Sequence, residues 1–244
     1  MKFILMPFIA INHVVSTVMS APGILFQKLE DKAYHKALDK DVILVFAGLT
    51  DFDESEGFNR SSLKLAKNQE SLIKRLSTLN KKMVLVLFGG NAIELDVEKY
   101  FDSILYMGLP GCAIGDATYD LLFGNVSPSG KLPITWCKKY EDTFNYQNYI
   151  KDPLELYKES IYVGYRYFET KDIEVMYPFG FGLSYANFEY KLKSILKHKD
   201  YLEFKVEVKN TSNIDASDVI EIYYGKKDSK IGRSKKVICG FEKV

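Results

Sequence analysis

The sequence predicts an α/β fold with a mostly parallel sheet flanked by helices (an α/β sandwich), followed by an incomplete antiparallel β-sandwich. Residues 42–47 and 83–88 are unbroken apolar runs rich in β-branched residues, with a helical pattern between them. Strands buried on both faces of a parallel sheet have this composition, and the spacing is that of a βαβ unit. In 188–193 and 201–208 apolar and charged residues alternate, as in half-exposed antiparallel strands.

The other elements of the first part follow in chain order. Apolar residues at steps of three and four predict helices, and Pro133 limits its strand to a sheet edge because proline cannot donate to a ladder. The pattern indicates helices over 27–40, 68–79, 94–100 and 113–123, a third strand over 103–107 and a short edge strand over 131–136. From 138 to 182 we expect a loop-rich segment crowded with tyrosine and phenylalanine, whose rings either line a sugar site or fasten the segment to the domain.

Three segments are predicted. Residues 27–185 form the α/β-sandwich domain, and 186–244 form a second domain with about four strands, where a complete sandwich has roughly seven. Residues 1–26 are left uncertain: a positive start and an apolar run fit a secretory signal peptide, or else a strand or helix of the fold. The chain is expected in the cytoplasm, or secreted if the run is a signal peptide.

Composition excludes several functions. With 33 basic and 32 acidic residues, the net charge of +1 gives no field that would attract nucleic acid, and the N-terminal apolar run is too short to span a membrane. Cys112, Cys137 and Cys239 are too far apart for a zinc site or a disulfide framework, so we expect buried or half-buried thiols. We predict no metal site and no cofactor.

An acidic loop follows the first buried strand. Asp51, Asp53, Glu54 and Glu56 lie within six positions, and Gly57 permits a tight turn. Ligands of open α/β sheets bind outside the carboxyl ends of the strands, so carboxylates here are placed for chemistry. The simpler interpretation is a solvated acidic turn, since acidic residues are mostly exposed whatever their role.

Several motifs resemble the C-terminal half of glycoside hydrolase family 3, typified by β-glucosidases. The tail resembles the start of the fibronectin type III-like domain that follows in many members, and the whole resemblance covers about 41–244. The motifs that carry it are Glu54-Ser-Glu-Gly-Phe-Asn-Arg60, Gly108-Leu-Pro-Gly111, Leu122–Pro133, Ile161–Phe168 and Tyr177–Tyr185.

The resemblance implies a retaining hydrolysis of terminal β-linked sugars by two carboxylates. The family's nucleophilic aspartate lies in a preceding TIM barrel, which we expect to be absent from this chain, and Glu56 matches the glutamate that acts as acid/base. Glu54 is the alternative, because a two-residue slip would align it instead. Where the family usually has aspartate beside Arg60, this chain has Asn59, so an ion pair is expected to be lost.

The proposed chemistry explains the acidic loop. To protonate a leaving oxygen near neutral pH, a carboxyl must keep its proton, which desolvation or neighbouring negative charge favours. Asp53 and Glu54 would supply such charge to Glu56. The expected partners are a β-linked glucoside or oligosaccharide and a separately encoded barrel domain, and the isolated chain is expected to be inactive.

Two other interpretations remain. A nucleotide-binding domain has the same architecture, but here the first loop carries carboxylates in place of a glycine-rich phosphate cradle, and like charges repel. The second is a non-catalytic remnant, or a sugar- or partner-binding module, from a split or decayed gene. Open apolar strand faces and an unpaired edge would favour a partner chain in that case.

Overall fold

The computed structural model of the chain describes residues 3–4, 23–51, 53–57, 59–146 and 157–244. Two compact units, Met1–Gly111 and Cys112–Val244, make up the chain. The apolar run predicted as a signal peptide or as part of the fold lies mostly in 5–22, outside the described residues. Among the helices that are described, none has the length and apolar character needed to cross a bilayer.

A parallel four-stranded sheet forms the centre of the first unit, in the order β1-β2-β3-β4. Strands β2 and β3 pair in continuous register from Val42 opposite Lys82 to Gly48 opposite Phe88. This sheet and its helices confirm the predicted α/β class. Its strands are β1 (Phe3–Ile4), β2 (Val42–Gly48), β3 (Lys82–Phe88) and β4 (Ser103–Gly108).

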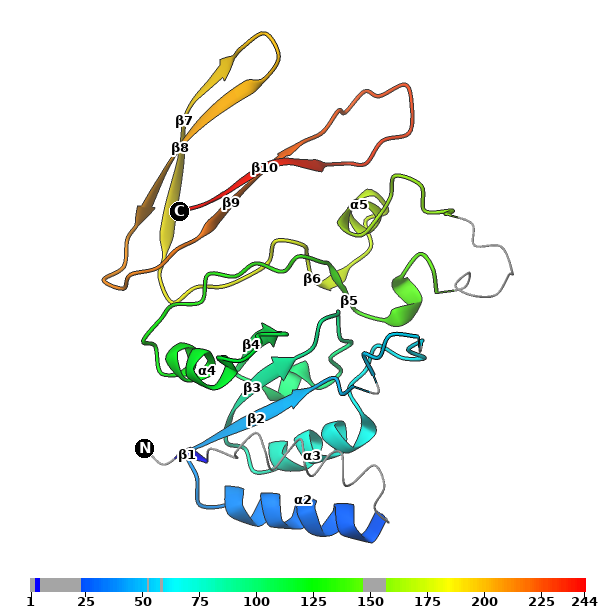
Figure 1. Cartoon of the computed structure of the whole chain (residues 1–244), viewed down its shortest axis with the longest axis vertical. Helices are drawn as coiled ribbons and strands as arrows, with labels where there is room; N and C mark the ends of the chain where they lie inside the picture. The colour runs from blue at the N-terminus through cyan, green and yellow to red at the C-terminus, as the bar shows by residue number, and fades with distance from the viewer. Residues whose placement is uncertain (1–2, 5–22, 52, 58, 147–156) are drawn as a thin grey trace. The chain divides into compact units, whose positions relative to one another are not determined.

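Helices α2 (Gly23–Ala37) and α3 (Lys67–Ser77) lie next to each other in the first unit (Figure 1). Strands added in chain order by right-handed crossovers place their helices on one face of the sheet. Arg75 of α3 joins the two helices, because its guanidinium is 2.5 Å from Asp31 and lies over the ring of Tyr34. The buried apolar core includes Ala37, Ile43, Leu44, Val45, Leu65, Ile73, Leu76, Leu85, Val86, Leu87 and Val97.

The helix predicted over 94–100 is only a single 3₁₀ turn, η1 (Glu98–Tyr100). The first residue of the predicted helix, Glu94, instead pairs with Lys64 in an isolated parallel bridge, and residues 96–97 form a turn. The Lys64 ammonium lies 3.2 Å from the Glu94 carboxylate and 2.6 Å from that of Asp96. Hydrogen bonds to Asp96 and Glu94 raise the pKa of Lys64, so the ammonium stays charged in this bridge.

The end of β2 is held by α3. The backbone N–H of Gly48 donates to Oε1 of Gln69 at 3.0 Å, and Nε2 of Gln69 donates to the Gly48 carbonyl at 2.8 Å. A Cβ on Gly48 would lie 2.2 Å from the Phe88 carbonyl oxygen, so glycine is required for the close approach of β2 and β3. The loop after β2 therefore starts from a fixed point.

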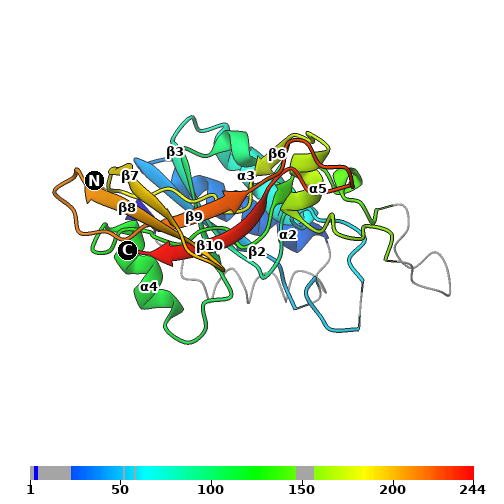
Figure 2. The same cartoon turned by 90° about the horizontal axis from the view of Figure 1, so that it is seen from above.

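In its described residues, the second unit has three two-stranded antiparallel sheets, β5-β6, β7-β8 and β9-β10. Sheet β7-β8 corresponds to the alternating strands predicted over 188–193 and 201–208. Figure 1 shows β7-β8 and β9-β10 as two separate ribbons, and Figure 2 shows the same strands from above. The elements of this unit are α4 (Ile114–Leu122), β5 (Trp136–Cys137), η2 (Tyr140–Asp142), α5 (Tyr165–Thr170), β6 (Val175–Tyr177), β7 (Phe188–Lys197), β8 (Leu202–Asn210), β9 (Val219–Tyr224) and β10 (Val237–Lys243).

One prediction for the second unit needs correction. The edge strand expected over 131–136 is confined to β5, because Leu132 exchanges backbone hydrogen bonds with Gly180 and Phe181 outside any strand. The segment expected to be loop-rich is mostly irregular in its described residues, and it also contains the short elements α5 and β6. Its rings pack on one another, as in the stacked pair of Tyr165 and Phe179 with centroids 4.8 Å apart, which favours fastening over a sugar-binding role.

Side chains of the motif 122–133 form hydrogen bonds and an ion pair with later residues of the second unit. Ser127 and Ser184 share a hydrogen bond of 2.9 Å between their hydroxyls. Nζ of Lys131 lies 2.7 Å from the buried carboxylate of Asp218, which also accepts a hydrogen bond from the Tyr190 hydroxyl. These contacts join the motif to β7 and to the residue before β9, and the domain boundary at 185/186 remains a prediction.

The three cysteines are free thiols in the structure. Cys137 is buried in β5, as expected. Cys112 and Cys239 are exposed, so the prediction of buried or half-buried thiols is wrong for these two. Cys112 directly follows the exposed residue Gly111, and Cys239 faces outward on β10, which has no third strand beside it within the described residues.

Candidate active-site loop

The acidic loop leaves the carboxyl end of β2 as a tight turn. The Leu49 N–H donates to the Phe88 carbonyl at 3.0 Å, and the Asp53 N–H donates to the Thr50 carbonyl at 2.8 Å. The Asp53 carboxylate accepts in return from the Thr50 N–H and hydroxyl, at 2.9 and 2.8 Å. An aspartate that bonds the backbone of its own turn stabilises that turn, so Asp53 has a local role.

Glu54 points from this turn to the segment after β3. Its two carboxylate oxygens lie 2.8 and 3.0 Å from the N–H of Gly90, and Nδ2 of Asn91 donates to Oε1 at 3.1 Å. Gly90 and Asn91 follow the neighbouring strand of the sheet. The Glu54 carboxylate therefore connects two loops at the carboxyl edge of the sheet.

Tyr106 of β4 adds a third contact at this edge. Its hydroxyl donates a short hydrogen bond to the Gly89 carbonyl, and the Gly89 N–H donates to the Gly108 carbonyl at 3.1 Å. Burial and the nearby charge of Glu54 raise the pKa of Tyr106, so the phenol keeps the proton that it donates. The turn at Gly89 is thus held by β4 on one side while Glu54 binds Gly90 on the other.

Glu56 lies two residues beyond Glu54 and is exposed. Within the described part of the chain, its carboxylate makes no hydrogen bond and no ion pair. The carboxylates of Asp53 and Glu54 accept hydrogen bonds from Thr50 and Gly90. That their negative charge acts on Glu56 stays a prediction. Gly57 follows with φ of +87°, a conformation that favours glycine. Asn59 is exposed and Arg60 half-buried.

Sequence reasoning missed the residues that receive Glu54. Sequence patterns assign no role to Gly89, Gly90, Asn91 or Tyr106. A rule of parallel sheets could have found them, because loops that follow neighbouring strands meet at the same edge. The donors in the loop after β3 were thus the natural partners for a carboxylate in the loop after β2.

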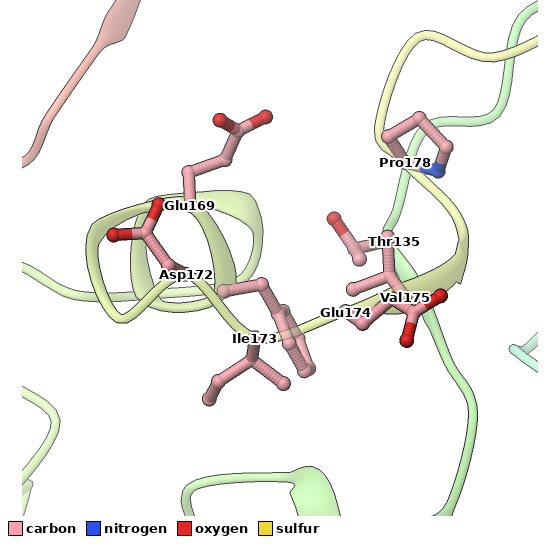
Figure 3. A pocket seen from close by; sticks show the side chains of 8 residues that line it. Thr135, Glu169, Asp172, Ile173, Glu174, Val175 and Pro178 are labelled. Atoms are coloured by element: carbon pink, nitrogen blue, oxygen red, sulfur yellow. The ribbon is translucent and has the colours of Figure 1, made fainter.

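A hollow of about 320 Å³ in the second unit is a separate candidate (Figure 3). Three acidic side chains, Glu169, Asp172 and Glu174, stand around it. Each one is paired with a lysine: Glu169 with Lys236 at 2.7 Å, Asp172 with Lys235, and Glu174 with Lys138 at 2.5 Å. These carboxylates therefore neutralise the protein's own cations, which weighs against a catalytic role.

Clustered carboxylates can also bind a metal ion. In the residues described by the structure, no group of three or more His, Cys, Asp or Glu side chains is arranged to hold a metal ion. In the loop, the Asp53 carboxylate binds Thr50 and the Glu54 carboxylate binds Gly90, so the two do not converge on one point.

Comparison with known proteins decides the family. Residues 2–185 match the family model described as the glycosyl hydrolase family 3 C-terminal domain. The chain belongs to glycoside hydrolase family 3. This finding confirms the resemblance carried by the motifs from Glu54 to Tyr185, and the acidic loop and both strands that position it lie inside the matched region.

Individual relatives support the assignment. The chain is 38% identical over 223 residues to "Thermostable beta-glucosidase B" of Acetivibrio thermocellus and 35% identical over 234 residues to "Beta-glucosidase BoGH3A" of Bacteroides ovatus, with 89% and 91% of the chain covered. Among solved structures, β-glucosidase from Kluyveromyces marxianus in complex with glucose has a TM-score of 0.86 and 31% identity over 89% of the chain.

The family 3 chain is much shorter than these relatives. It spans 30% of the A. thermocellus protein, 31% of the B. ovatus protein and 26% of the K. marxianus structure. The similarity thus shows that the chain contains a glycosidase-type C-terminal domain with the fold of that domain.

Proposed function

We propose that this chain supplies the acid/base carboxyl group, Glu56, for the hydrolysis of terminal β-linked glucosides with retention of configuration. The nucleophilic carboxylate comes from a barrel domain that lies outside residues 1–244. The substrate is a β-linked glucoside or oligosaccharide. In support, relatives that cover most of this chain are named β-glucosidases, and one matching structure holds glucose.

The observation that carries the assignment is the contrast between the two glutamates of the loop. Glu54 accepts hydrogen bonds from Gly90 and Asn91, so its carboxylate is occupied within the domain. Glu56 is exposed and has no protein partner in the described part of the chain. A proton donor must reach the leaving oxygen of a substrate, and of the two glutamates only Glu56 is free to do so.

The chemistry needs two carboxyl groups with different tasks. In the first step Glu56 protonates the glycosidic oxygen while the barrel's carboxylate attacks the sugar carbon and forms a glycosyl-enzyme intermediate. In the second step Glu56 takes a proton from a water molecule whose oxygen attacks the same carbon. The bond to the barrel's carboxylate breaks, and the sugar leaves with its original configuration. Retaining enzymes keep the two groups about 5 to 5.5 Å apart, so Glu56 must be brought against the barrel's site.

Co-expression tests the proposal. The full chain is produced alone and together with the part of the A. thermocellus relative that the match does not cover, and each preparation is assayed on an aryl β-glucoside. We expect negligible turnover from the chain alone and turnover from the complex. In the complex, Glu56→Gln should lower kcat/KM on a substrate with a poor leaving group by about 10²- to 10⁴-fold, the usual contribution of general acid catalysis.

The matched control is Asp51→Asn, which neutralises an exposed carboxylate of the same loop and should leave turnover unchanged. Equal activity of the Glu56→Gln complex and the unaltered complex would refute the role of Glu56. Association with the second polypeptide but no turnover would favour the alternative of a non-catalytic partner-binding module.

A further inference from the structure

We propose that Glu54 is a positioning residue that fixes the loop bearing Glu56 to the segment after β3. The inference rests on the proposed function, since Glu56 is the group that it places. The two glutamates then have separate tasks: Glu54 binds the domain, and Glu56 faces the substrate. The link is the contact of the Glu54 carboxylate with Gly90 N–H and with the Asn91 amide.

Chain geometry makes this link effective. Two residues of fully extended chain span at most about 7 Å, so fixing Glu54 confines the backbone of Glu56 to a small volume. Upstream, the turn between Thr50 and Asp53 fixes the start of the loop through hydrogen bonds between these two residues. Downstream, Gly57 with its φ of +87° allows backbone freedom that other residues lack. Glu54 is therefore the last fixed point before Glu56.

The receiving segment is itself built to hold a carboxylate. The Gly90 N–H donates to both oxygens, and hydrogen bonds to a charged acceptor are stronger than those between neutral groups. A Cβ on Gly90 would lie 3.0 Å from Cδ1 of Leu109 and 3.3 Å from Oε1 of Glu54. The absence of a side chain at position 90 thus lets the Glu54 carboxylate approach the backbone.

Strand β4 fixes this segment from its other side. The Tyr106 hydroxyl donates to the Gly89 carbonyl, and the Gly89 N–H donates to the Gly108 carbonyl. Gly90 is therefore attached to the rigid sheet through its neighbour. The position of Glu56 follows from the sheet through a short series of contacts, from β4 to Gly89 and Gly90, then to Glu54 and to the loop.

The link itself is tested on the isolated full chain by NMR, using the amide of Gly90 in a ¹⁵N-labelled sample. Glu54→Ala should speed hydrogen exchange of this amide by about tenfold, the effect expected for losing a hydrogen bond to a charged group. Glu54→Gln keeps an acceptor oxygen and should restore part of the protection. Asp51→Ala, the matched control in the same loop, should leave Gly90 unchanged. Unchanged exchange in Glu54→Ala would overturn the inference.

The positioning role is tested in the complex with the barrel, using two leaving groups. Correct placement of an acid matters for an alkyl β-glucoside, whose alkoxide leaves poorly, and little for a 2,4-dinitrophenyl β-glucoside, which departs without protonation. Glu54→Ala should lower kcat/KM by about tenfold on the first and less than about threefold on the second, a fraction of the full effect of general acid catalysis. A variant that is only destabilised would lose kcat/KM equally on both substrates. An equal loss would therefore contradict the inference.

The Glu56→Gln complex separates the two proposals. Loss of alkyl glucoside cleavage in Glu56→Gln together with full activity in Glu54→Ala would overturn the positioning role and leave the proposed function standing. If Glu56→Gln lowers kcat/KM equally on the alkyl and the dinitrophenyl glucoside, the proposed function is overturned. The positioning role of Glu54 in catalysis then falls with it.

Discussion

Nζ of Lys131 lies 2.7 Å from Oδ1 of Asp218, and this ion pair joins the motif 122–133 to the residue that precedes β9. The same ammonium donates to the Gly182 carbonyl at 2.7 Å, and the Tyr190 hydroxyl binds the other oxygen of Asp218. The backbone of Asp218 also exchanges two hydrogen bonds of 2.9 Å with Val244. Segments distant in sequence therefore meet at one aspartate.

Lys131→Met should lower the free energy of unfolding of the chain by about 3 kcal/mol, because it leaves a mostly buried carboxylate without its cation. The two side chains are only 19% and 10% exposed, so water replaces little of the lost interaction. Urea unfolding followed by circular dichroism measures the effect. In a double-mutant cycle, Lys131→Met combined with Asp218→Asn should cost less than the sum of the single changes; strict additivity would contradict a direct pair.

The ionisation of Asp218 should make the stability of the chain depend on pH. Burial works against its charge, but hydrogen bonds from Lys131, Tyr190 and the Val219 N–H outweigh burial and lower the pKa of Asp218 in the folded chain. Its contribution is therefore fully present above the ordinary aspartate pKa of about 3.9 and is lost as the pH falls through the lowered value.

Urea midpoints of the unaltered chain and of Asp218→Asn measure this effect. The difference between them should stay constant from neutral pH down to about pH 5 and shrink below about pH 4. Asp215→Asn, at a nearby exposed aspartate, is the control and should show no such change. A difference that grows on acidification would contradict the prediction.

Gly48→Ala should destabilise the first unit by about 3 kcal/mol, at the upper end of typical overpacking costs. The new methyl group would meet the Phe88 carbonyl oxygen at 2.2 Å, and backbone of a central strand cannot move aside. Gly115→Ala in α4 is the matched control: its Cβ meets nothing within 4 Å, and alanine favours a helix, so the second unit should be unchanged or slightly more stable. Thermal and urea unfolding measure both; normal stability of the Gly48→Ala variant would refute the packing argument.

Thiol chemistry should distinguish the three cysteines. Cys112 and Cys239 are exposed, whereas Cys137 is buried, so two thiols should react quickly with a disulfide reagent in the native chain and the third only on unfolding. Counting the released thiolate by absorbance, without and with denaturant, measures this. Cys137→Ser should leave the native count at two, and rapid reaction of all three native thiols would contradict the burial of β5.

Sequence patterns located the parallel sheet well for a physical reason. Strands such as Val42–Gly48 are buried on both faces, so their uninterrupted apolar runs leave little choice of structure. The six-residue α5 and the three-residue β6 could not be predicted in this way, because they are too short to show a period. Their positions are set by ring packing, such as that of Tyr165 on Phe179, between residues that are not neighbours in sequence.

The candidate site was predictable in part. The position of Glu56 in a loop after a buried strand follows from local pattern, and the family confirmed here supports the motif. The hydrogen bond between Glu54 and Gly90 does not follow from local pattern. The two residues are 36 positions apart, and their contact depends on which loops meet in space. Likewise, the exposure of Cys239 depends on what lies beside β10, which local hydrophobicity does not encode.

The strand order β1-β2-β3-β4 has a consequence for synthesis of the chain. Every strand of this sheet lies beside the one made immediately before it, so the sheet can grow in the direction of translation. Among the described strands, none that is made later has to insert between two that have already paired. The docking point for Glu54 is therefore completed as soon as the ribosome has released β3 and β4, long before the C-terminal hairpins emerge.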